Sequence, residues 1–175
     1  MTDESRGPPH GPIWQLLADE HARLDSLLER AGACQSAEEL SAYDQFRRAL
    51  LRHIGMEEKV LLPAAERARG TPIEEAGRLR LDHGALAALM IPSPQPRIIR
   101  AIRTVLARHN PLEESANGVY DCCELLAGAA ADEVLASLKA TGPVPVKPHL
   151  DTTKVYDALR RALARASYDE HLADT

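Results

Sequence analysis

The chain has 175 residues and a formal net charge of −5, a length that suits one domain or a domain with a short appendage. Hydrophobic residues make up 45% of the sequence but aromatic residues only 3%, so the core must consist of Leu, Ala, Ile and Val, which favours helices over sheets. The acidic balance gives no electrostatic reason to expect nucleic acid as a partner. No apolar run approaches the roughly 20 residues of a membrane span, so no membrane partner is expected.

Residues 1–12 are polar and rich in Gly and Pro, with no apolar segment and no basic start. They are predicted to form a disordered tail on a cytoplasmic protein. The three cysteines contain no C-x-x-C pair and leave an odd thiol, which favours a reducing compartment. The adjacent Cys122 and Cys123 are either redox-active or, as is more common, buried small hydrophobic residues.

The first two helices are predicted over residues 13–31 and 37–62. His21 lies in the middle of the apolar row of the first helix, which Gly32 ends. Ser36 and Glu39 have the spacing of a capping box, so the second helix begins between them and carries His53 on an otherwise apolar face. Pro63 is expected to kink or interrupt this helix.

Two further helices complete the predicted bundle. The third is expected from Pro72 to Ile91, after a second capping box, with His83 inside its apolar row. The fourth is expected to begin near Ile98, to carry His109 and to end at an Asn-Gly break at residues 117–118. Four helices with short connections predict an all-α, up-down-up-down four-helix bundle over residues 13–128.

Residues 129–175 are predicted to form a helical C-terminal extension. Short helical pieces flank residue 130, and residues 142–148 form a Pro-rich connector that cannot be helical. A last amphipathic helix is expected from residue 151 or 152 to Tyr168. Its apolar side can pack on the bundle or on a second subunit, which would make a homodimer.

A metal site is suggested by two identical spacings. His53 and Glu57 are four residues apart and stack on one helix face, and His109 and Glu113 repeat the pair. A single histidine in an apolar row is usually a core residue with a satisfied ring, but unpaired buried polar groups cost about 2–7 kcal/mol each. The inward groups number four histidines and two glutamates, and a metal would satisfy them together: His21, His53, Glu57, His83, His109 and Glu113. Imidazole with carboxylate suits iron, zinc, nickel or copper better than calcium or magnesium.

This pattern resembles the hemerythrin-like, or HHE cation-binding, family over residues 12–120. The phrases that carry the resemblance are His53 to Pro63 and His109 to Glu114. The resemblance implies two non-haem iron ions with a shared oxo or hydroxo bridge, although zinc or another divalent metal fits the ligand types too. It also implies that Glu57 and Glu113 bridge the irons, that the inward histidines are terminal ligands, and that a small ligand such as oxygen, nitric oxide or peroxide reacts there.

Three positions near the motifs carry further expectations. Respiratory hemerythrins have a second histidine where this chain has Ala87, so reversible oxygen carriage is not expected. The segment Ser115–Tyr120 lacks the proline common in the family, so the fourth helix should end irregularly, and Pro111 should kink it or form a bulge. Glu58 and Glu114 point about 100° away from their neighbours, so they either support the ligands or face solvent. Asp25, one turn after His21, is expected to be exposed.

Three functions remain open at this point. The first is a redox-active di-iron protein in sensing or redox stress defence, and the second is an iron-sensing or regulatory module without catalysis. The third is a metal-free helical interaction protein. No nucleophile or general base stands out beyond the candidate ligands themselves, so the sequence assigns no catalytic residue.

Overall fold

The computed structural model describes residues 10–174, which form helices, turns and extended connections without any strand. Most of these residues lie in helices, which confirms the predicted all-α class for this part of the chain. The long helices are α1 (Pro12–Ala31), α2 (Ala37–Met56), α4 (Ala76–Leu89) and α5 (Pro96–Glu114). The predicted disordered tail lies outside the described residues as far as residue 9, and Pro12 already belongs to α1.

Two helix ends follow the sequence signals and one does not. Ser36 and Glu39 form the predicted capping box, and Gly32 ends α1 with a φ of +51°. The third helix begins at Ala76 rather than at the predicted Pro72. Its predicted cap is not used because Ile73 is buried in the core, so the preceding residues form a turn that delivers this side chain before the helix starts.

The second helix widens instead of kinking at Pro63. A π-helical turn, Glu57–Leu61, joins α2 to α3 (Leu62–Arg69), and the amide of Leu62 donates to the carbonyl of Glu57, five residues back. In a regular α-helix the ring of Pro63 would clash with the carbonyl of Lys59. We attribute the wider turn to the relief of this clash. Such turns are frequent at functional sites.

The irregularity expected at Pro111 is absent. The backbone of α5 stays α-helical through this residue to Glu114. Because Pro111 lies in the last turn, little helix remains beyond it to be redirected. The irregular end of α5 is present, since Asn117 adopts a φ of +64° in the turn before α6 (Val119–Ala127).

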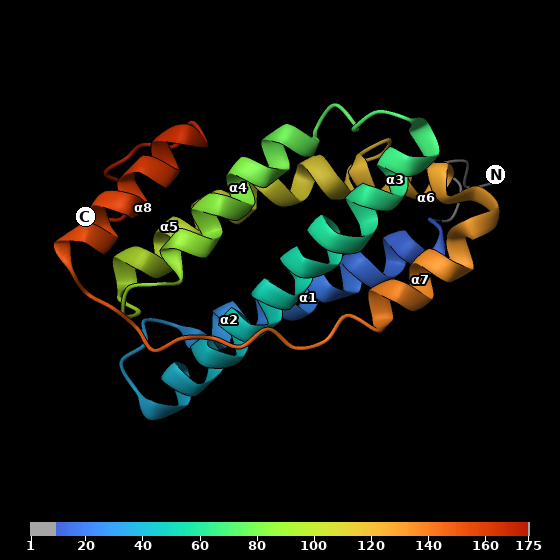
Figure 1. Ribbon diagram of the computed structural model, residues 1–175. Helices are drawn as coiled ribbons and strands as arrows, with labels where there is room; N and C mark the ends of the chain where they lie inside the picture. Colours follow the sequence, from blue (N-terminus) through green and yellow to red (C-terminus); the bar gives the residue numbers. More distant parts are fainter. Residues whose placement is uncertain (1–9, 175) are drawn as a thin grey trace, which may run out of the picture.

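The long helices lie side by side around one interior, with α1 against α2, α4 against α5, and α6 across α1, α3 and α5 (Figure 1). Buried apolar residues form two clusters within it. One contains Leu24, Leu50, Leu86 and Val105, and the other contains Leu17, Met56, Leu79 and Val119. The helices α1, α2 and α4 pass from one cluster to the other near their histidines, and His109 follows the last cluster residue of α5, Leu106. The candidate ligands therefore lie in a polar layer between two apolar ones.

The C-terminal extension wraps around the bundle of its own chain. The helix α7 (Ala131–Lys139) follows a short 3₁₀ turn, Gly128–Ala130, and packs beside the π-helical turn. The Pro-rich connector is extended, as predicted, and leads to α8 (Thr153–Arg165) at the other end of the molecule (Figure 1). The apolar side of α8 is buried against α4, with Leu159 and Leu163 in the core. This face therefore belongs to the chain's own bundle, and the homodimer remains a prediction without support.

Between residues 10 and 174, no helix combines the length and the apolar character needed to cross a bilayer.

Candidate metal centre

All the side chains predicted as metal ligands converge on the polar layer. Each is at most 4% exposed, and they come from α1, α2, the π-helical turn, α4 and α5: His21, His53, Glu57, His83, His109 and Glu113. The two stacked pairs have the expected geometry. The Nε2 atom of His53 lies 3.2 Å from Oε1 of Glu57, and Nε2 of His109 lies 3.2 Å from Oε2 of Glu113.

The candidate ligands fall into two groups that share both carboxylates. His21 and His53 form one group with Glu57 and Glu113, and His83 and His109 form the other with the same two glutamates. Within each group, the potential ligand atoms lie within 4.8 Å of one another. The two oxygens of Glu57 face different halves, because Oε1 is 3.2 Å from His53 and Oε2 is 3.1 Å from Nε2 of His83. A carboxylate in this position can bridge two adjacent ions.

The second glutamate of each motif supports a histidine on another helix. Glu58 accepts a hydrogen bond of 2.7 Å from Nδ1 of His83, and Glu114 contacts Nδ1 of His21 in a short hydrogen bond. With Nδ1 engaged, Nε2 of each ring faces the interior. Such outer partners fix the orientation of a ligating histidine and raise its basicity. Of the two roles considered for Glu58 and Glu114, the structure favours support of the ligands.

Asp82 is a buried carboxylate that sequence reasoning missed. It pairs with Arg78 at 2.9 Å and lies 3.5 Å from Nδ1 of His109. A signal was present, since Asp82 directly precedes His83 on an inward part of α4. No comparable partner exists for His53, whose buried Nδ1 has no hydrogen bond within the described part of the chain.

Several potential metal-ligand atoms in the layer have no hydrogen-bond partner within residues 10–174. Glu57 Oε2, His83 Nε2 and Glu113 Oε1 are buried and form no hydrogen bond among the described residues. Leaving such atoms unpaired is costly in a water-excluded interior. A metal ion between them would satisfy all three, and imidazole with carboxylate is a donor set that fits iron, zinc or copper. The residues present therefore fit a metal.

The electrostatics of the metal-free layer favour the charged forms of His83 and His109. Burial disfavours the charged form of His83, but the nearby carboxylates of Glu57 and Glu58 outweigh it and raise the pKa of His83 to about 9. Burial is likewise outweighed at His109, where Asp82 and Glu113 raise the pKa to about 10. Burial raises the pKa of Glu57, but His53 and His83 outweigh it and hold that pKa well below its usual range. Imidazolium–carboxylate pairs thus hold the layer together until a metal replaces the protons.

Tyr120 is the second residue that sequence reasoning missed at this site. It is fully buried, and its hydroxyl donates to Oε1 of Glu57 at 2.5 Å. The hydroxyl oxygen of Tyr120 also lies 3.2 Å from Glu113 Oε2, 3.2 Å from His21 Nε2 and 3.3 Å from His53 Nε2. The sequence carries no clear signal for this placement, because the break at residues 117–118 leaves the orientation of α6 undetermined.

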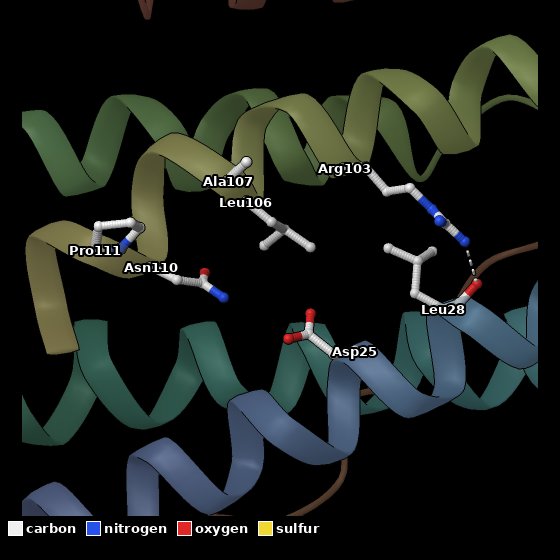
Figure 2. A pocket seen from close by; sticks show the side chains of 7 residues that line it. All are labelled: Asp25, Leu28, Arg103, Leu106, Ala107, Asn110 and Pro111. Carbon is white, nitrogen blue, oxygen red and sulfur yellow. Dashed lines mark hydrogen bonds between the residues drawn. The ribbon is translucent and has the colours of Figure 1, made fainter.

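A pocket of about 310 Å³ lies outside the polar layer, between α1 and α5. Figure 2 shows Asp25 opposite Asn110 across this pocket, with Arg103 donating to the carbonyl of Leu28 at its side. None of the candidate metal ligands lines it. Asp25 is exposed, as predicted, and Glu114 rather than Asp25 contacts His21.

The remaining histidines lie away from the layer and belong to no group of potential metal ligands among the described residues. His10 pairs with Asp121, His149 lies beside Arg47, and His171 contacts Asp174.

The cysteines are free thiols. Burial raises the pKa of Cys123 to about 12, so this thiol stays protonated and acts as a small core residue, as the sequence favoured.

Fold and site together define an all-helical protein with a buried His and Glu layer suited to metal binding. A sequence model of the family described as the hemerythrin HHE cation binding domain matches residues 13–126. The chain belongs to this family, which confirms the resemblance drawn from its motifs. A search of curated proteins found no match, and neither did a search of solved structures.

Proposed function

We propose that the protein holds a non-haem di-iron centre that binds or reacts with a small ligand, such as oxygen, nitric oxide or peroxide, in sensing or redox stress defence. The observation that carries this proposal is the sharing of Glu57 and Glu113 by two groups of ligand atoms. Two ions that share two carboxylates lie close enough to act on one small molecule. When bound, an iron pair would supply electrons to or accept electrons from such a molecule.

The protein's own residues hold and isolate this centre. His21, His53, His83 and His109 would be terminal ligands, and apolar clusters on both sides of the layer exclude bulk water. Glu58 and Glu114 keep two of the imidazoles aimed inward. Every candidate ligand is buried, and the pocket between α1 and α5 contains none of them, so the arrangement favours a molecule of a few atoms over a larger substrate.

The first experiment is metal analysis of the purified protein with an aerobic absorption spectrum. We expect about two iron atoms per chain, given two ligand groups. Glu57→Ala should lose most of the metal while the helices persist, because both groups lose a ligand. Glu74→Ala, an exposed glutamate on a turn, is the matched control and should retain both ions. Zinc or an absence of metal in the wild-type protein would contradict the proposal, and so would full iron retention in Glu57→Ala.

A regulatory module without catalysis is the alternative for the same centre. The burial of every ligand favours it, because a closed layer suits ligand binding better than rapid exchange of substrate and product. Catalytic consumption of peroxide or nitric oxide over many cycles would identify a redox enzyme. Stoichiometric binding with a spectral change would identify a sensor.

Inferences about the bundle topology and the cellular location belong with this proposal. The order of α1, α2 with α3, α4 and α5 supports an up-down-up-down bundle over residues 13–128, with residues 129–175 as an extension. The free state of Cys34, Cys122 and Cys123 supports a reducing, cytoplasmic location.

A further inference from the structure

We propose that Tyr120 is a further protein ligand, and that its phenolic oxygen takes a coordination position on the metal held by His21, His53, Glu57 and Glu113. The inference rests on the proposed function, since it requires a metal in the polar layer. It concerns a residue outside the two His-x-x-x-Glu-Glu motifs, on a helix that follows them.

The distances around the Tyr120 oxygen are those between neighbouring ligands of one metal ion. Metal–nitrogen and metal–oxygen bonds of about 2.1 Å at right angles place adjacent ligand atoms about 3 Å apart. The Tyr120 oxygen lies 2.5 Å from Glu57 Oε1 and 3.2 Å from Glu113 Oε2. It lies 3.2 and 3.3 Å from the Nε2 atoms of His21 and His53. One hydroxyl thus meets all four members of one ligand group.

The other half of the centre has no such oxygen. In the portion of the chain that the structure describes, no hydroxyl forms a hydrogen bond to His83 or His109, whose partners are carboxylates. The placement of Tyr120 is therefore selective.

The backbone around Tyr120 is built to hold the side chain in this place. The amide of Gly118 donates to the carbonyl of Ser115 at 2.6 Å, closing a tight turn after α5. At the far end of α6, Glu124 accepts hydrogen bonds from the amides of Ile13 and Trp14 at 2.7 and 2.9 Å. The first turn of α1 and the end of α5 thus hold α6 at both ends, which fixes the backbone of Tyr120 beside the layer.

Coordination of Tyr120 changes the balance of open positions. Two octahedral irons have about twelve coordination positions, of which a shared oxygen would take two, the four histidines four and the two bridging carboxylates four. About two positions then remain, one per iron. Tyr120 would fill the place on the His21 and His53 side. One metal–oxygen bond forms there, the phenolic O–H bond breaks, and the proton leaves to the buffer. The small ligand would then bind only to the metal on the His83 and His109 side.

The test is the spectrum of the protein loaded with iron(II) and oxidised in air. A phenolate bound to ferric iron gives an intense charge-transfer band in the visible, and excitation within it enhances the ring vibrations of that tyrosine. We expect this band in the wild-type protein and its loss in Tyr120→Phe, with iron release to a chelator at least about tenfold faster. Tyr43→Phe is the matched control, because Tyr43 is equally buried and its hydroxyl has no partner among the described residues.

The outcomes separate this inference from the proposed function. A protein that binds no iron contradicts the di-iron centre itself. A protein with about two irons but no phenolate vibrations overturns only the role of Tyr120, and so does a band that survives in Tyr120→Phe. If Tyr120→Phe does not fold, the inference can be tested in a variant with Tyr43, Tyr156 and Tyr168 all replaced by Phe. The sequence contains four tyrosines, so Tyr120 is then the one that remains. We expect that variant to keep the band, and its disappearance there would assign the band elsewhere.

Discussion

The two halves of the candidate centre look alike in sequence but differ in their surroundings. Each half contains one stacked His–Glu pair, and the second glutamate of that motif binds the Nδ1 atom of a histidine in the other half. Among residues 10–174, the hydroxyl of Tyr120 contacts the histidines of the His21 and His53 half alone, and His109 alone has a buried aspartate beside its Nδ1 atom. Near-identical motifs therefore do not make equivalent metal positions, because residues outside the motifs complete each half.

Removing one histidine from one half or from the other, in two separate variants, gives the largest expected change in iron content. His53→Ala leaves the ligand group of His83 intact, and His109→Ala leaves the group of His21 intact. We expect each variant to fall from about two irons per chain to about one, measured by metal analysis. The tyrosine band should disappear in His53→Ala and remain in His109→Ala.

Added imidazole provides the control for these two variants, because it can enter the space of the deleted ring and restore the second ion. The comparison between halves would fail if both variants lost all metal, since the two positions would then be one cooperative unit.

A second, smaller effect should come from the supporting glutamates. Glu58→Ala and Glu114→Ala each release the Nδ1 atom of one histidine, and loss of such a partner typically weakens metal binding about 10–100-fold. Competition with a chromophoric chelator measures this change. Asp25→Ala is the matched control, because Asp25 lies one turn from His21 but is exposed and does not contact its ring. Unchanged affinity in Glu58→Ala would show that packing alone orients His83.

The smallest effect concerns the turn that places Tyr120. A Cβ at Gly118 would lie 2.7 Å from the carbonyl oxygens of Glu113 and Ser115, so the backbone must shift. We expect Gly118→Ala to lower the free energy of unfolding by about 1–3 kcal/mol and to weaken the tyrosine band. Denaturant unfolding of the metal-free protein measures the first effect. Gly77→Ala has open space at its Cβ and should be neutral or stabilising by up to about 1 kcal/mol.

Helical periodicity was enough to bring the candidate ligands together, because a buried helix face fixes which side chains meet. Four histidines and two glutamates at inward positions all lie in the layer. The end of α1, the capping box at Ser36 and the extended connector also followed from local signals. These features depend on a few neighbouring residues, which a sequence displays directly.

The features that the sequence did not predict depend on packing between distant segments. Pro63 indicated an interruption, but the helix continues through a π-helical turn that precedes this residue. Pro111 had little effect on α5 because so little helix follows it. Burial of Ile73 places the start of α4 at Ala76 instead of the predicted Pro72. Tyr120 was missed because a turn separates α6 from the periodic pattern of α5, so nothing local sets its direction.

The two halves also differ in when they can form during synthesis. The Glu58–His83 pair, 25 residues apart, can close soon after α4 is complete, and the half with His83 and His109 needs no residue beyond Glu113. His21 waits for Glu114 and Tyr120, which follow it by 93 and 99 residues. At roughly 5–20 residues per second, the ribosome makes the missing residues only on the order of 5–20 s later. The metal position of His83 and His109 can therefore be complete once α5 has left the ribosome, whereas the full centre can be loaded only after α6 has left it.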